Sequence, residues 1–156
     1  MRVLMSMEGF SDVIDEARIA DLCVSCMRTL GLPESTELSV SFVDNDAIAE
    51  LNEEYRGKEG PTDVLSFECD NVDDGFPGEQ DELDYTLGDI IIAPDVARAQ
   101  AQELHEALSD EIELLVVHGV LHLCGYDHIE DGEAALMEKK QQELLALWRA
   151  HSEGGE

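Results

Sequence analysis

Three of the five histidines in this chain stand within the run HGVLHLCGYDH, from His118 to His128. His118 and His122 are four residues apart, so on a helix their side chains lie on one face, with Cβ atoms about 5–6 Å apart. That separation suits two imidazoles that bind one zinc ion at Zn–N distances of about 2.0–2.1 Å. Gly125 can end the helix in the left-handed conformation, and the turn it permits could bring His128 back as a third ligand. Three protein ligands leave one position for water, which is typical of a catalytic zinc site.

The run matches the zinc-peptidase pattern H-E-x-x-H-x-x-G-x-x-H at every position but one. Gly119 stands where that pattern has its glutamate general base. The spacing therefore predicts a metal site, while peptidase chemistry lacks its proton acceptor. The alternative, ordinary helix and turn histidines, is disfavoured by three histidines at this spacing with the glycine in register.

A second group of residues, Arg56 and Lys58, holds two of the nine basic side chains. Both lie in a loop with Gly57 and Gly60, between an expected helix and an expected strand. An arginine beside a metal-activated water could neutralise the charge that builds on a phosphoryl group in the transition state. Pairing of a surface arginine with a neighbouring acid is the other interpretation, and the residues alone leave both open.

Length and composition predict one domain over residues 1–156, large enough for a hydrophobic core. The longest nearly apolar stretch, residues 114–124, is too short to span a bilayer. The first residues have no secretory hydrophobic region followed by a cleavage site, so we expect a cytoplasmic protein with no membrane partner.

The net charge of −28, from 37 acids against nine Lys and Arg, argues against a polyanionic partner, because phosphate contacts need clustered basic residues. Screening over about 8 Å at physiological salt means that distant acids do not exclude a local basic site. The four cysteines predict no disulfide framework. Cys23 and Cys26 are expected to be buried helix cysteines, and Cys124 a poor fourth metal ligand.

Periodicity and capping signals predict the elements that position these residues. Strands are expected at residues 2–7, 37–43, 64–67 and 87–93. Helices are expected at residues 12–30, from Asp44 or Asn45 to 55, at 94–108, from an N-cap at Ser109 through 124, and at 131–150. Residues 69–84 are expected to form a solvated loop, His105 and His151 to be surface residues, and Trp148 to pack in the core. The sequence thus predicts an α+β fold, a small mixed sheet packed by several helices with the metal helix at its centre.

Three motifs, HGVLHLCGYDH, LNEEYRGKEGPTDVLSF and LGDIIIAP, together resemble the YbeY family of single-strand endoribonucleases, bacterial rRNA maturation factors. The resemblance runs from about Val40 to the final helix. It implies that His118, His122 and His128 are the zinc ligands, that Arg56 is the catalytic arginine, and that the fold is zincin-like. It also implies late maturation of the 16S rRNA 3′ end, ribosome quality control, and association with the small ribosomal subunit and its proteins, with single-stranded RNA and not DNA as substrate.

The leading hypothesis is hydrolysis of RNA phosphodiester bonds with one Zn²⁺ ion, in which Arg56 binds the scissile phosphate. The nucleophile, water or the ribose 2′-hydroxyl, stays open. Asp127 is either an orienting partner of a ligand imidazole or an ordinary turn residue. The competing hypotheses are a zinc metallopeptidase-like hydrolase and a non-catalytic, zinc-stabilised ribosome assembly factor.

Overall fold

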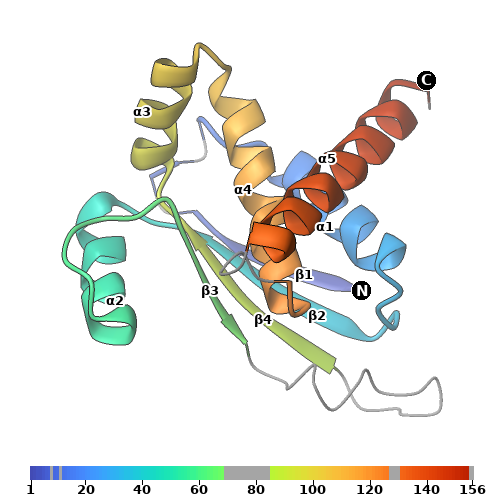
Figure 1. Cartoon of the computed structure of the whole chain (residues 1–156), viewed down its shortest axis with the longest axis horizontal. Helices are drawn as coiled ribbons and strands as arrows, with labels where there is room; N and C mark the ends of the chain where they lie inside the picture. Colours follow the sequence, from blue (N-terminus) through green and yellow to red (C-terminus); the bar gives the residue numbers. More distant parts are fainter. Residues whose placement is uncertain (8, 11, 69–84, 127–130, 155–156) are drawn as a thin grey trace.

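Four strands and five helices make up the described part of the chain, residues 1–7, 9–10, 12–68, 85–126 and 131–154 of the computed structural model (Figure 1). In chain order they are β1 (Arg2–Ser6), α1 (Glu16–Thr29), β2 (Thr36–Phe42), α2 (Asn45–Arg56), β3 (Val64–Glu68), β4 (Tyr85–Ile92), α3 (Pro94–Leu104), α4 (Leu108–Leu123) and α5 (Asp131–Gly154). The predicted α+β class is confirmed. The loop predicted at residues 69–84 lies outside the described residues.

The sheet has the strand order β1-β2-β4-β3 and is mixed, as predicted. β1 pairs with β2 and β2 with β4 in parallel, whereas β3 runs antiparallel to β4 at the other edge. Side chains alternate between the two faces, so Leu38, Val40 and Ile90 enter the main core while Leu65 joins a smaller one. Helices α1, α4 and α5 cover the first face, and α2 packs against the other beside β3 (Figure 1).

Helix α4 is the central helix and is buried almost all round, as its sequence predicts. It packs against α1, α3 and α5 and crosses β3 and β4. The predicted N-cap is wrong: the helix begins at Leu108 after an extended Ala107, so Ser109 already lies within the first turn. At its other end Gly125 has φ 96°, as predicted, and donates to His122 while Tyr126 donates to Leu121. This pair of bonds satisfies the last carbonyls of the helix and turns the chain away from its axis.

A buried carboxylate, Glu113 of α4, fastens α1 and α5 to the central helix. Its side chain is 2% exposed and accepts from Arg18 Nε at 3.0 Å and from an Arg149 nitrogen at 3.2 Å. Beside it, Trp148 is buried as predicted and donates from Nε1 to Asp21. The three helices over the sheet are therefore held in register by directional contacts as well as by apolar packing.

Cys23 and Cys26 are buried on α1, as predicted. Burial raises the pKa of Cys26 to about 12 and that of Cys23 further, so both thiols stay protonated and act as small apolar groups. No helix in the part of the chain described above is long and apolar enough to cross a membrane.

Candidate active site

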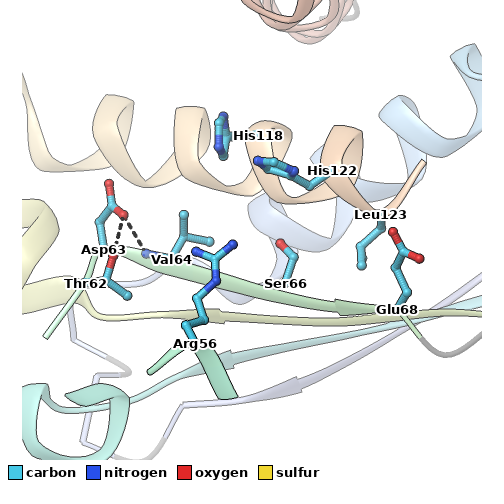
Figure 2. Close-up of a pocket in the computed structure, with 9 residues that line it drawn as sticks. All are labelled: Arg56, Thr62, Asp63, Val64, Ser66, Glu68, His118, His122 and Leu123. Carbon is cyan, nitrogen blue, oxygen red and sulfur yellow. Dashed lines mark hydrogen bonds between the residues drawn. The ribbon is translucent and has the colours of Figure 1, made fainter. Parts of the chain in front are cut away.

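A cavity of about 480 Å³ opens between the end of α2, strand β3 and the C-terminal half of α4 (Figure 2). Its lining is mostly polar. The residues are Arg56, Thr62, Asp63, Val64, Ser66, Glu68, His118, His122 and Leu123. Two histidines from the HGVLHLCGYDH run and the arginine from the second motif thus meet in one space, although more than sixty residues of chain separate them.

The rings of His118 and His122 stand next to each other on one face of α4, as the four-residue spacing predicts. Their centroids are 4.7 Å apart and the ring planes are inclined by 74°. Both side chains are half-buried. His118 Nδ1 lies 2.5 Å from Oε1 of Gln141 on α5. Two adjacent imidazoles that face a polar cavity form a donor set suited to zinc.

The third predicted ligand, His128, lies outside the described residues, as does Asp127. Among the residues that are described, no three His, Cys, Asp or Glu side chains gather closely enough to hold a metal ion. His105 and His151 are exposed, as predicted, and do not line the cavity.

Arg56 reaches the cavity because α2 ends there. The helix stops at Gly57, whose φ of 65° is the left-handed conformation that glycine adopts readily. The buried Asn52 donates from Nδ2 to the carbonyl of Gly60 at 2.9 Å and so pins the following loop to the helix. Figure 2 shows the guanidinium of Arg56 pointing across the cavity toward the two histidine rings on α4.

Four further polar residues, Thr62, Asp63, Ser66 and Glu68, line the cavity, and the sequence interpretation gave them no role. Asp63 Oδ1 accepts from the Val64 backbone N–H at 2.8 Å and from the Thr62 hydroxyl at 3.3 Å, so its carboxylate is fixed at the start of the strand. Ser66 and Glu68 follow on the same face of the strand as Val64. Ser66 and Glu68 alternate along β3 with the apolar Leu65 and Phe67, which lie on the other face of the sheet with α2. This alternation is the sequence signal that could have placed the two polar residues on the cavity face.

Gly119 faces the sheet and is not among the residues that line the cavity. A Cβ built at this position would come within 2.9 Å of Ile90 Cδ1 and of Ile90 Cγ2 in β4. A glutamate here could be placed only if Ile90 moved aside. Position 119 is therefore a packing position, and this cavity has no counterpart of the peptidase general base at that place in the run.

Glu111 is a buried acid at the start of α4, two turns before His118. It is 5% exposed, and within the described chain its Oε2 has no hydrogen-bond partner. Burial raises the pKa of this carboxyl, and the nearby carboxylates of Glu106 and Asp63 raise it further. Asp63 thus links the cavity electrostatically to a buried acid behind it.

The family model described as "Endoribonuclease YbeY" matches residues 8–149 of this chain. The chain belongs to the endoribonuclease YbeY family. Its sequence is 44% identical to the "Endoribonuclease YbeY" of Thermobifida fusca, over 86% of each chain. It is 43% identical to that of Salinispora tropica, over 96% of this chain and 98% of the relative. The family predicted from the motifs is confirmed.

A solved structure shares the fold. The solution structure of TM1509 from Thermotoga maritima matches with a TM-score of 0.59 at 28% identity, over 96% of this chain and 93% of that one. Membership in the YbeY family makes the chain a nuclease hydrolase that cuts RNA internally. The cavity that joins Arg56, His118 and His122 is its candidate active site.

Proposed function

We propose that this chain hydrolyses phosphodiester bonds in single-stranded rRNA, with Zn²⁺ held by His118, His122 and His128 and with Arg56 as the phosphate-binding residue. We further propose that its substrate is the 3′ end of 16S rRNA during late maturation and ribosome quality control. It would meet this substrate in the cytoplasm, on the small ribosomal subunit with its associated proteins.

This proposal rests on which basic side chains make ion pairs with acids and which do not. Six of the nine basic residues make salt bridges with acids; they are Arg2, Arg18, Arg28, Arg98, Lys140 and Arg149. Arg56, by contrast, makes no ion pair with any residue that the structure describes, although the chain carries 37 acids. Its guanidinium points into a cavity lined by two histidines (Figure 2). An arginine that makes no ion pair with a described acid, although Asp63 and Glu68 line the same cavity, is suited to bind a phosphate there.

Lys58 extends the basic site. It follows Arg56 by two residues and also has no ion pair among the described residues. The two cations therefore lie two residues apart in a loop region that also carries acids, and neither makes an ion pair with a described residue. Because exposed charges are screened over about 8 Å at physiological salt, this region can contact backbone phosphates despite the net charge.

The residues present fit a zinc ion. His118 and His122 supply two neutral nitrogen ligands from one helix face, and the Schellman turn at Gly125 redirects the chain before His128. When bound, zinc acts as a Lewis acid and makes water nucleophilic at neutral pH. The protein's own part is to hold the phosphate. Arg56 would donate to its non-bridging oxygens and offset the negative charge that develops in the transition state.

A peptidase-like hydrolase is the less supported alternative, because Gly119 faces Ile90 and offers no base to the cavity. A zinc-stabilised assembly factor without catalysis would not need an arginine in that cavity that makes no ion pair with the described residues. Cleavage assays separate all three functions.

The test combines metal analysis with cleavage of an end-labelled RNA. Purified full-length protein is expected to carry close to one zinc and to cut the single-stranded RNA but not its duplex, and a chelator is expected to abolish cleavage. His118→Ala should remain folded and lose cleavage by about 100-fold or more. The matched control is His151→Ala, an exposed histidine on α5, which should cleave like the unaltered protein.

Two results would contradict the proposal. Full cleavage by metal-free protein would remove the metal from the reaction. If the zinc-loaded protein hydrolysed a peptide library but left the RNA uncut, the peptidase-like alternative would be favoured.

A further inference from the structure

We propose that Gln141 is a positioning residue for the metal site: it holds His118 with the proton on Nδ1, so that Nε2 is left as the metal-binding nitrogen. This inference rests on the proposed role of His118 as a ligand. It concerns a residue of α5 that lies 23 positions from the histidine in sequence and outside all three family motifs.

The contact itself indicates the direction of the hydrogen bond. His118 Nδ1 lies 2.5 Å from Oε1 of Gln141. A side-chain carbonyl oxygen can only accept, so this contact is a hydrogen bond when the imidazole carries its proton on Nδ1, and that is the tautomer we infer. A neutral imidazole has one ring proton, and fixing it on Nδ1 leaves a lone pair on Nε2. Metal-binding histidines commonly donate their other ring N–H to an oxygen in this way, which sets the tautomer and the ring orientation.

Gln141 sits where such an acceptor is held firmly. It is 8% exposed, and it shares the buried face of α5 with Leu144, Leu145 and Trp148, at the three-, four- and seven-residue spacings of one helix stripe. A buried amide in an apolar stripe is costly unless it is hydrogen-bonded, and the contact with His118 gives its carbonyl oxygen a partner. The side chain therefore has a specific polar partner and little freedom to leave it.

The position of α5 is fixed from its far end. Arg149, eight residues after Gln141, donates to the buried Glu113, which lies five residues before His118 on α4. Polar contacts thus tie α4 to α5 at two places: Arg149 meets Asp110 and Glu113 at one, and Gln141 meets His118 at the other. The contact of Arg149 with Glu113 sets the register of the two helices. In that register Gln141 meets the ring of His118 and orients it.

The consequence is a defined loss when the acceptor is removed. Losing such an oxygen partner of a metal-binding histidine typically costs about 10–100-fold in metal affinity. Gln141→Leu keeps the volume but has no acceptor. Gln141→Glu keeps an oxygen in the same place and should restore the bond. The matched control is Gln142→Leu, the exposed neighbour on the same helix.

The experiment has two readouts on the full-length chain. Two-bond ¹⁵N–¹H correlations of metal-free, ¹⁵N-histidine-labelled protein, at about pH 8 where neutral imidazole dominates, report which nitrogen of His118 bears the proton. Competition with a chromophoric chelator then gives the affinity for Zn²⁺. We expect the Nδ1–H form in the unaltered protein, a shift away from it in Gln141→Leu, and an affinity lowered by about 10-fold or more in that variant only.

Three outcomes would overturn the inference. One is a proton on Nε2 in the unaltered chain, which needs no variant and so holds even if Gln141→Leu fails to fold. The second is an unchanged affinity in Gln141→Leu. The third is an equal loss in Gln141→Glu, because that would indicate a packing defect and not a lost acceptor. If the unaltered chain binds no zinc at all, the proposed metal-dependent function fails. If it binds zinc but Gln141→Leu binds it equally tightly, only the role of Gln141 fails.

Discussion

The backbone of Gly119 in α4 lies directly against the side chain of Ile90 in β4. A Cβ added to Gly119 would lie 2.9 Å from two carbons of Ile90 and 3.1 Å from a third, closer than real side chains approach. This contact lets α4 lie close to the sheet. His118 and His122, which flank position 119 in sequence, therefore face β3, the strand that follows Arg56 in the chain. The glycine of the HGVLHLCGYDH run therefore has a structural reason that is independent of any catalytic base.

Replacing Gly119 by alanine should lower the free energy of unfolding. Alanine favours a helix over glycine by about 1 kcal/mol, but overpacking a buried site costs about 1–3 kcal/mol. Ile90 is fully buried and β-branched, so it cannot swing aside. Urea unfolding of Gly119→Ala should show a net loss. Combining it with Ile90→Val, which removes the crowding Cδ1, should recover part of that loss, whereas strictly additive losses would mean that this contact is not the cause.

Arg56→Gln should lower RNA cleavage by about 100-fold or more, because the amide cannot offset transition-state charge as the guanidinium does. Binding of single-stranded RNA should also weaken, and its dependence on salt should become shallower by about one phosphate contact. Filter binding at several salt concentrations measures the second effect. The matched control is Arg98→Gln on α3, an exposed arginine already 3.9 Å from Asp95. Arg98→Gln should leave cleavage and salt dependence unchanged, and a similar loss in both variants would contradict a specific role for Arg56.

Much of the fold was predictable because its signals are local. Alternation in β2, the Asp44 cap of α2 and the apolar run of α4 each depend on neighbours within a few residues. The error at the start of α4 is also local: Ser109 has the better capping side chain, yet the N-cap lies two residues earlier, at Ala107. The strand order β1-β2-β4-β3 could not be predicted, since it depends on pairings between distant segments.

The candidate site also has a part that local sequence predicts and a part that depends on contacts between distant segments. The four-residue spacing of His118 and His122 predicts their common face, and the structure has them there. Gln141 and Asp63 could not be predicted, because each meets α4 only through tertiary packing. A glutamine on an apolar helix stripe has no sequence signal that distinguishes a ring-orienting partner from a surface residue.

Glu113→Ala should destabilise the protein by roughly 1.5–3 kcal/mol, since it removes two hydrogen bonds to a charged group; the arginines are partly exposed and regain water. Thermal and urea unfolding measure the loss. The matched control is Glu34→Ala, which removes an ion pair of the same 3.0 Å length between Arg28 and an exposed glutamate. Exposed pairs contribute little, so Glu34→Ala should hardly change stability. Equal losses in the two variants would mean that burial of Glu113 is not what gives its contacts their strength.

Glu111→Gln should stabilise the protein at neutral pH, and the gain should depend on pH. Burial, with Glu106 and Asp63 nearby, raises the folded-state pKa of this carboxyl above its unfolded value of about 4.3. Below the unfolded value the acid is neutral in both states and carries no penalty. As the pH rises through the folded pKa, the folded protein must ionise a buried group, and stability is lost.

The difference in unfolding free energy between Glu111→Gln and the unaltered protein, measured from about pH 4 to pH 8, isolates this effect. It should be small at the acid end, grow with rising pH, and level off at roughly 1–3 kcal/mol, the cost of an unsatisfied buried acceptor. Glu103→Gln, an exposed acid on α3, should give a flat difference over the same range. If the Glu111→Gln difference instead grew toward low pH, the carboxylate would have to be stabilised by the fold, because only a lowered pKa produces that slope.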